Sequence, residues 1–400
     1  MPESLLNRRL KLGNFLGIDL FVHWSFALVV AYVAISTRDG GTTGMAFAIA
    51  QLLGVFLCVT LHEYGHAMAA RRFGIGTADI TLLPIGGVAR LKSMPRIPWQ
   101  ELVVALAGPA VNVVIAAMIV GGLWIFTDGL ILRGLAAEVK DYLGIEVIDE
   151  ALAESLFQIL VAPSWLSYIT VMLVVNCFLV AFNMIPAFPM DGGRVFRSVL
   201  AMVSDYRNAT VIASRVGVVL AVLMAFVLLN ANPTNPIPIL IAAFIGYAGL
   251  AEARQVTVME SVRGLTAGRV MIRSQASIPM DLPLNEIRLC WQSSSAPALP
   301  VVTSDSRVIG MLRLTDIAEA LATGVDPATT AARLVDRGTR VATLRENDAL
   351  ESALLRAGKH GRQIPVVDEQ GLLTGIVDLD SMLARAEISR HAPMTLNEVS

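Results

Sequence analysis

Two histidines and a glutamate lie close together in an apolar stretch of the chain, in the sequence His-Glu-Tyr-Gly-His over residues 62–66. His62 and His66 are four residues apart, so on a helix their side chains share a face and can hold one metal ion. Glu63 follows the first histidine, where its carboxylate can take a proton from a metal-bound water. A charged residue in the middle of a membrane helix costs about 2.5–3.5 kcal/mol and usually has a function. The segment therefore predicts a metal site.

A catalytic zinc ion usually has three protein ligands and an open fourth position, so two histidines leave one ligand to find. Asp191 is the candidate, in the sequence Asn-Met-Ile-Pro-Ala-Phe-Pro-Met-Asp-Gly-Gly over residues 183–193. The prolines break a helix, and the paired glycines permit unusual turns. Taken alone, the segment also fits a helix-ending loop with an aspartate cap. Together with the two histidines, it predicts Asp191 as the third ligand.

The composition is that of a membrane protein. Of the 400 residues, 55% are hydrophobic and 16% are charged, against roughly 25% charged in soluble proteins. The mean hydropathy is +0.63, and the apolar excess ends near residue 255. A net charge of −2 without a long basic run argues against nucleic acid as a partner. The three cysteines lie far apart and predict no disulfide framework.

The apolar stretches and the charges between them predict a topology. A helix needs about 20 apolar residues to cross a bilayer, and cytoplasmic loops carry an excess of Lys and Arg. Basic residues concentrate in the N-terminal arm and after the second, fourth and sixth stretches, whereas the segment between the third and fourth is acidic. We therefore predict about six transmembrane helices, a first span that is retained rather than cleaved as a signal peptide, and cytoplasmic N- and C-termini. The expected spans are 18–36, 45–69, 101–126, 165–184, 211–229 and 237–252.

Residues 80–90 follow the histidine helix and predict two short strands around a Pro/Gly turn. An exposed strand edge can pair with an extended peptide, so Gly86 and Gly87 are candidate substrate contacts. A plain cytoplasmic connector is the alternative.

A repeat follows the apolar part of the chain. Leu-Pro-Val-Val at 299–302 recurs as Ile-Pro-Val-Val at 364–367, and Gly-Met-Leu at 310–312 recurs 65 residues later as Gly-Ile-Val. The common offset indicates one strand, turn, strand and helix unit used twice. We divide the chain into a transmembrane domain that contains the metal site at 1–257 and repeats at 258–322 and 323–400.

The paired motifs resemble the site-2 protease family of intramembrane zinc metalloproteases (peptidase M50), and Gly-Pro-Ala-Val-Asn at 108–112 matches that family's GPxxN element. The resemblance covers roughly residues 15–255. It implies that His62, His66 and Asp191 bind one Zn²⁺ ion per chain and that Glu63 is the general base. It also implies an integral membrane enzyme of the cell membrane. The implied partner is a membrane-anchored, single-span protein, for example of the anti-sigma factor type.

Two asparagines lie within the matched motifs. Asn112 and Asn183 can donate a hydrogen bond to the substrate or to the tetrahedral intermediate, and fastening of helices is the alternative for both. Because the ligand motifs lie near the cytoplasmic ends of their spans, we expect cleavage towards the cytoplasmic side.

The repeat resembles a pair of CBS domains, which bind adenine nucleotides in many proteins through the motif Gly-h-h-Ser/Thr-x-x-Asp, where h is apolar. The first copy keeps the aspartate as Asp316 but has Arg313 in place of the hydroxyl residue. The second copy has Asp378 at the hydroxyl position and Ser381 at the aspartate position. Asp316 is therefore the candidate nucleotide contact, and a dimerisation or gating role without a ligand, including a homodimer, is the alternative.

Two other functions compete with proteolysis. A CBS-regulated channel or transporter predicts polar residues spread through several spans, but here they cluster around one metal site. A non-catalytic membrane scaffold has no need of Glu63. The sequence therefore predicts an α-helical polytopic membrane protein with a C-terminal α/β tandem CBS domain and zinc protease activity.

Overall fold

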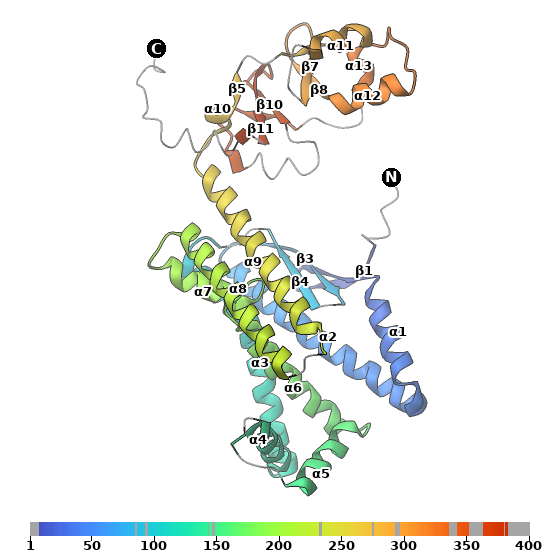
Figure 1. Cartoon of the computed structure of the whole chain (residues 1–400), viewed down its shortest axis with the longest axis vertical. Coiled ribbons are helices and arrows are strands. Elements are labelled where there is room, and N and C mark those ends of the chain that lie inside the picture. The colour runs from blue at the N-terminus through green and yellow to red at the C-terminus, as the bar shows by residue number, and fades with distance from the viewer. Residues whose placement is uncertain are drawn as a thin grey trace. The chain divides into compact units, whose positions relative to one another are not determined.

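A computed structural model describes residues 8–84, 86–92, 95–142, 144–145, 149–231, 234–273, 276–292, 297–335, 342–351, 363–379 and 381–382. The chain forms two compact units, Met1–Ala253 and Arg254–Ser400. The first is a helical bundle with one sheet (Figure 1). Its helices are α1 (Phe26–Ser36), α2 (Gly41–Arg72), α3 (Pro98–Thr127), α4 (Leu130–Tyr142), α5 (Glu150–Val161), α6 (Trp165–Asn183), α7 (Asp191–Ala201), α8 (Tyr206–Ala231) and α9 (Ile237–Val262).

Five helices in the described part of the chain are long and apolar enough to cross a membrane, namely α2, α3, α6, α8 and α9. They coincide with the second to sixth predicted spans, which confirms a polytopic helical fold. The first predicted span, 18–36, is wrong as a single helix, because Ile18–His23 is strand β2 and only α1 is helical. Eleven residues of helix reach about 16 Å, roughly half of the hydrocarbon core. The alternation of buried Ile18 and Leu20 around Asp19 is the period of a strand.

The sheet lies against the histidine helix. Strands β1 (Arg9–Phe15), β2, β3 (Thr77–Leu83) and β4 (Gly86–Leu91) follow one another in that order across it. The pairing of β3 with β4 confirms the predicted hairpin. Ile18 and Ile80 point from the sheet into a core that they share with Phe56 and Ala67 of α2. This core packs the sheet against the histidine helix, which contacts both β3 and β4.

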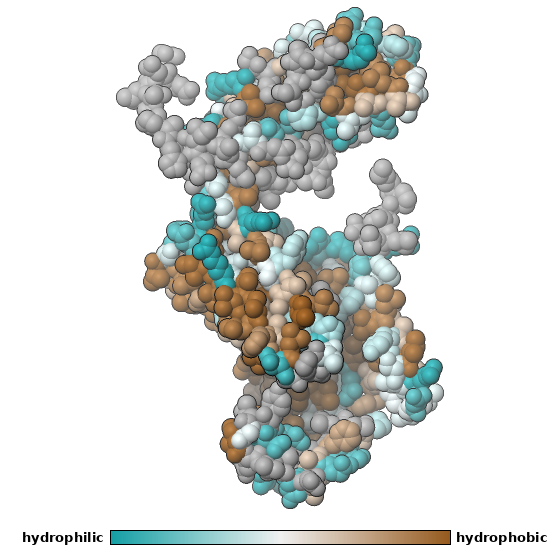
Figure 2. Space-filling model, in the orientation of Figure 1, coloured by the Kyte–Doolittle hydropathy of each residue, from teal (hydrophilic) through white to brown (hydrophobic). Residues whose placement is uncertain are grey.

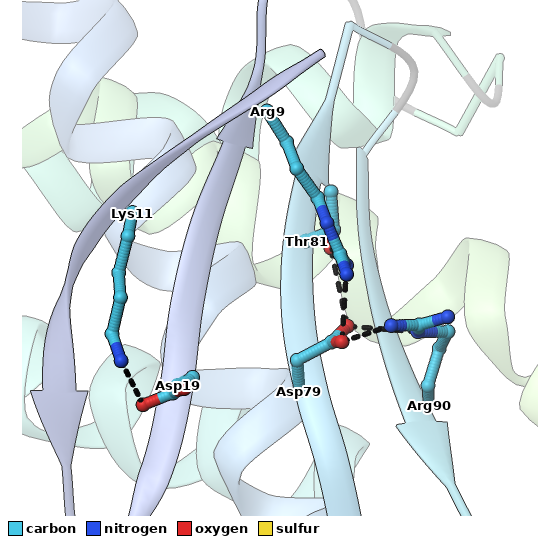
Figure 3. A network of polar contacts seen from close by, with 6 residues as sticks. All are labelled: Arg9, Lys11, Asp19, Asp79, Thr81 and Arg90. Carbon is cyan, nitrogen blue, oxygen red and sulfur yellow. Dashed lines mark hydrogen bonds and ion pairs between the residues drawn. The ribbon is translucent and has the colours of Figure 1, made fainter. Parts of the chain in front are cut away.

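A polar network ties the outer strands of this sheet to its middle (Figure 3). Arg9 Nη1 of β1 donates to Asp79 Oδ2 of β3 at 3.0 Å, and Arg90 Nε of β4 donates to Asp79 Oδ1 at 2.9 Å. The hydrogen bonds from Arg90 hold the pKa of Asp79 below its ordinary value, although burial opposes this shift. Lys11 and Asp19 form a second ion pair between β1 and β2. The network fixes β4 at the edge of the sheet.

Helix α3 is the centre of the bundle and packs against α2, α6 and α7. Gly65 of α2 allows a close approach to α3, because a Cβ there would lie 2.6 Å from the carbonyl oxygen of Ala107. Helices α4 and α5 lie at the end of the bundle away from the sheet (Figure 1). The sheet end and the α4–α5 end therefore define opposite ends of the long helices.

The outer surfaces of α8 and α9 are apolar. Figure 2 shows hydrophobic residues gathered over these helices. Large side chains that are more than half exposed there include Val222, Leu223, Phe226, Leu240 and Phe244. A surface of this kind is unfavourable in water and suits the hydrocarbon core of a bilayer.

A buried arginine cluster joins four helices at the sheet end. Arg197 of α7 is 1% exposed, and its Nε and Nη2 donate to Glu101 of α3. Its Nη1 donates to Glu252 of α9 at 2.7 Å. The guanidinium also lies 5.0 Å from the ring of Tyr206 in α8. The cluster locks α7 against its neighbours.

The second unit contains the repeat. One sheet of this unit has strands β6 (Ile278–Pro279), β7 (Ala298–Val302) and β8 (Val308–Arg313). The other sheet has strands β5 (Ile272–Arg273), β9 (Leu344–Arg345), β10 (Gln363–Val367) and β11 (Leu373–Asp378). The β7–β8 and β10–β11 hairpins carry a register shift at the same place, Val301/Val302 and Val366/Val367. Its helices are α10 (Ala267–Val270), α11 (Leu284–Gln292), α12 (Leu314–Ala322) and α13 (Ala331–Leu334).

Candidate metal centre

Two helices bring three potential ligands to one point inside the bundle. His62 and His66 lie on one face of α2, and Asp191 is the first residue of α7. Asp191 Oδ2 lies 3.1 Å from the Nε2 atom of each histidine, and the two Nε2 atoms are 3.0 Å apart. All three residues are buried. The structure thus brings the carboxylate of Asp191 next to two imidazoles that are 125 residues or more away from it in sequence.

The chain between α6 and α7 places Asp191. Helix α6 ends at Asn183, and α7 starts directly after Met190, whose backbone is extended. Gly192 and Gly193 lie against the returning chain, and a Cβ at Gly193 would be 2.7 Å from the carbonyl carbon of Ala187. Both glycines are helical, so they serve close packing rather than the unusual turns expected from the sequence. A side chain at either position would push Asp191 away from the histidines.

Each histidine is oriented by a partner at its Nδ1 atom. His66 Nδ1 lies 2.7 Å from the carbonyl oxygen of Val104, and His62 Nδ1 lies 2.6 Å from Asn112 Oδ1. An oxygen of this kind only accepts, so each Nδ1 carries the hydrogen. Both Nε2 atoms therefore turn a lone pair towards Asp191, which is the ligating tautomer of histidine.

These three potential ligand atoms fit a zinc ion. Three atoms with lone pairs point at one another, and this arrangement needs a cation or a proton among them. The opposite wall has no side chain, because a Cβ at Gly108 would lie 2.7 Å from His62 Nε2 and closer still to His66 Nε2. Two imidazoles and a carboxylate with outer partners on both rings form a known type of catalytic zinc site. Among the described residues, His62, His66 and Asp191 form the group of potential ligands whose atoms lie close enough together to hold a metal ion.

Glu63 lies beside this centre and contacts the edge strand. Its Oε2 accepts a hydrogen bond from the backbone N–H of Ala89 in β4 at 2.9 Å. Gly87 makes this approach possible, because a Cβ there would be 2.8 Å from Glu63 Cγ. Gly86, the first residue of β4, has a φ of 139°, which favours glycine. The candidate base, Gly86 and Gly87 are thus parts of one small region.

The two asparagines differ in their surroundings. Asn112 is fully buried, and its side chain contacts His62 and, through Nδ2, Asn176 Oδ1 at 2.8 Å. Its contacts favour the helix-fastening alternative over a contact with substrate. Asn183 is the half-buried last residue of α6.

Sequence reasoning missed Asn176, although a polar residue in the middle of an apolar span was an available signal. It also missed the pairing of Arg197 with Glu101 and Glu252, because in the sequence Arg197 contributes only to the basic charge of a connecting segment.

In the second unit, Asp316 is engaged by the residue that replaces the motif's hydroxyl. Arg313 Nε donates to both carboxylate oxygens of Asp316 at 3.1 Å, and the backbone N–H of Arg313 donates to Oδ2 at 2.9 Å. Asp316 therefore caps the start of α12 and neutralises Arg313. In the second copy, Ser381 Oγ donates to the backbone carbonyl oxygen of Asp378 at 3.4 Å.

Comparisons with known proteins find similar families and relatives. Peptidase family M50 matches residues 50–224, and the CBS domain matches residues 267–323 and 337–387. The chain is 27% identical over 398 residues to a Synechocystis sp. protein named as a zinc metalloprotease, covering 95% of this chain and 96% of that protein. It is 28% identical to the zinc metalloprotease MJ0392 of Methanocaldococcus jannaschii, covering 78% and 80% of the two chains. The solved site-2 protease from Methanocaldococcus jannaschii is 28% identical, covers 62% of this chain and 96% of that chain, and gives a TM-score of 0.39.

Proposed function

We propose that this chain, which belongs to peptidase family M50 and carries a C-terminal pair of CBS domains, cleaves transmembrane segments of membrane-anchored proteins. It is an integral membrane zinc metalloprotease of the site-2 type. The observation that carries the proposed substrate is the position of the ligands. His62, His66 and Asp191 meet inside the helical bundle, and the neighbouring Glu63 contacts the edge strand β4.

In the proposed mechanism, His62, His66 and Asp191 hold the zinc ion. When bound, zinc lowers the pKa of a water molecule and polarises the scissile carbonyl. The carboxylate of Glu63 takes the proton from the attacking water and passes it to the leaving amine. Asn112 and the Val104 carbonyl keep both imidazoles in the ligating orientation.

Strand β4 offers a way to present the substrate. A peptide bond in an intact helix is shielded, so the scissile segment must be extended before hydrolysis. In the described sheet, β4 is the last strand, with β3 on one side only. An extended substrate added along its other edge would lie next to Glu63, which already bonds to the β4 backbone. Gly86 and Gly87 would contact that substrate.

We further propose a multi-pass topology with cytoplasmic N- and C-termini. Basic residues such as Arg9, Lys11, Arg71 and Arg90 belong to the sheet end of the bundle, whereas the acidic segment belongs to the α4–α5 end (Figure 1). This distribution satisfies the positive-inside rule when the sheet end is cytoplasmic. A cysteine at Lys140 in α4 should then react with an impermeant thiol reagent on intact cells. A cysteine at Arg71 should react only after lysis, and the reverse pattern would contradict the orientation.

The CBS pair is proposed as a regulatory or dimerisation module. Because Arg313 already pairs with Asp316, we expect it to act through protein contacts, including a homodimer, rather than by binding an adenine nucleotide. The sedimentation of the purified chain at several concentrations tests the dimer.

The protease mechanism is tested on protein purified in detergent with a model single-span substrate. Wild type should hold about one zinc ion per chain and cleave the substrate. Glu63→Gln should keep the zinc and lose about 10²–10⁴-fold in cleavage rate, because only the base is removed. His62→Ala/His66→Ala should lose both. Cleavage by Glu63→Gln at the wild-type rate would contradict the assigned base.

A further inference from the structure

A second buried asparagine stands behind the metal centre. Asn176 of α6 is fully buried and contacts both α2 and α3. Its Nδ2 donates to the carbonyl oxygen of Met172 at 2.7 Å and to Cys58 Sγ of α2 at 3.2 Å. Because the Met172 carbonyl only accepts, the amide nitrogen of Asn176 must face it, and Oδ1 must face Asn112. The orientation of the Asn176 amide is thus fixed by the backbone of its own helix.

This orientation is passed on to Asn112 and then to His62. Asn176 Oδ1 only accepts, so it selects the Nδ2 side of Asn112, which donates to it at 2.8 Å. Asn112 Oδ1 is then left to accept from His62 Nδ1 at 2.6 Å. The hydrogen of His62 consequently stays on Nδ1, and its Nε2 lone pair points at the metal position.

The two histidines differ in how securely this tautomer is held. His66 Nδ1 faces the backbone carbonyl of Val104, which has no donor to offer in any orientation. His62 Nδ1 faces a side-chain amide, and rotation of that amide by half a turn would present N–H in place of oxygen. The imidazole would then accept at Nδ1 and carry its hydrogen on Nε2, where it blocks ligation. Among the two, only His62 needs a second group that prevents this rotation.

We propose that Asn176 is a positioning residue of the zinc site, which fixes the metal-binding tautomer of His62 by locking the amide of Asn112. The inference rests on the proposed assignment of His62, His66 and Asp191 as zinc ligands. It concerns affinity for the metal, so it is tested without any substrate.

The test measures zinc affinity of the purified full chain in detergent by competition with a chromophoric chelator. Asn176→Leu removes the acceptor for Asn112 and should weaken zinc binding by about 10–100-fold, the usual effect of losing an outer partner of a ligand. Thr170→Val is the matched control, since Thr170 lies on the same helix, is 1% exposed, and its hydroxyl has no partner among the described residues. It should leave the affinity unchanged. If Asn176→Leu does not fold, Asn176→Ala removes the same acceptor and carries the same prediction.

A double-mutant cycle separates orientation from packing. In Asn112→Asp both side-chain oxygens are acceptors, so rotation cannot offer a donor to His62 Nδ1, and one of them faces the acceptor Oδ1 of Asn176. Asn176→Leu removes that opposed pair of acceptors and should cost less than about threefold in this background, although it costs about 10–100-fold in wild type. An equal loss in both backgrounds would show a packing role and overturn the proposal. If wild type binds zinc and Asn176→Leu binds it with the same affinity, this inference alone is overturned. If wild type binds no zinc, the proposed function is overturned as well.

Discussion

Two buried clusters of polar groups lie in the helical unit, and they are built in opposite ways. In the arginine cluster, Arg197 directs its N–H groups at the carboxylates of Glu101 and Glu252. In the metal centre, the Nε2 atoms of His62 and His66 face each other and the carboxylate of Asp191. The first cluster matches a cation with anions inside the protein, although Glu101 Oε2 has no hydrogen-bond partner among the described residues. The second gathers acceptors only, so it is complete when a cation is bound.

Helix α7 links the two clusters. Asp191 is its first residue, and Arg197 follows within the same eleven-residue helix. Arg197 joins α7 to α3, which also supplies the partners of both histidines, Asn112 and the Val104 carbonyl. The matched cluster therefore supplies rigidity, and the unmatched cluster uses that rigidity to keep its ligands in place. Function and stability should respond separately to substitutions in the two.

The largest effect is expected at the metal centre. Asp191→Ala should abolish stoichiometric zinc binding and lower the cleavage rate by about 10³-fold or more, because the metal and its activated water are lost together. The zinc-free variant should unfold with a free energy within about 1 kcal/mol of zinc-free wild type, since one of three opposed acceptors has been removed. Metal analysis, the cleavage assay and unfolding in mixed detergent check the three parts. Strong destabilisation of zinc-free Asp191→Ala relative to zinc-free wild type would contradict the proposed difference between the two clusters.

The arginine cluster should show the reverse behaviour. Arg197→Met leaves the buried carboxylate of Glu101 and the half-buried carboxylate of Glu252 without their cation, and should lower the unfolding free energy by about 3–5 kcal/mol. Arg197→Met/Glu101→Gln should recover part of this loss, because one uncompensated charge is removed. Where these variants remain folded, zinc affinity should stay within about threefold of wild type. Loss of zinc at unchanged stability would place Arg197 in the metal site instead.

The sequence was informative where chemistry fixes spacing. The four-residue step from His62 to His66 predicts a shared helical face, and the choice of Asp191 needed only the rule that a third ligand completes the site. The packing of α7 could not be predicted, because the partners Glu101, Arg197 and Glu252 are distant in sequence and have no fixed spacing. The strand at Ile18–His23 was missed because an apolar run does not distinguish a buried strand from a membrane helix.

Asn176 illustrates the same limit within the site. Its function depends on which atom of each amide faces its neighbour, and sequence contains no information about side-chain orientation. Only the chain of contacts from the Met172 carbonyl to His62 reveals it.

A third polar cluster, at the sheet, should have a smaller effect and a pH dependence. Asp79 has a pKa lowered by Arg90, so its contribution to stability is present above the unfolded pKa of about 3.9 and is lost as the pH falls through the lower folded value. Asp79→Asn should cost about 1 kcal/mol at neutral pH. It should also flatten the fall in stability below pH 4. Unfolding curves between about pH 3 and pH 7 check both parts, and an unchanged pH profile would contradict the assignment.

The smallest effect is expected at the exposed pair of the first CBS copy. Arg313→Ser should change stability by less than about 1 kcal/mol, because the pair is open to solvent. It restores a hydroxyl at the motif position and frees Asp316, so affinity for AMP should rise relative to wild type. Calorimetric titration of the full chain measures this. Tight AMP binding by wild type would contradict the expected blocking role of Arg313.

The contrast between the two buried clusters depends most directly on the identity of what fills the metal centre. The zinc K-edge absorption spectrum of purified wild type measures this. We predict about one zinc ion per chain with imidazole nitrogens at about 2.0–2.1 Å and carboxylate or water oxygen at about 2.0–2.2 Å. The imidazole signal should disappear in His62→Ala/His66→Ala. Zinc bound without imidazole, or an imidazole signal that survives the double substitution, would contradict the account.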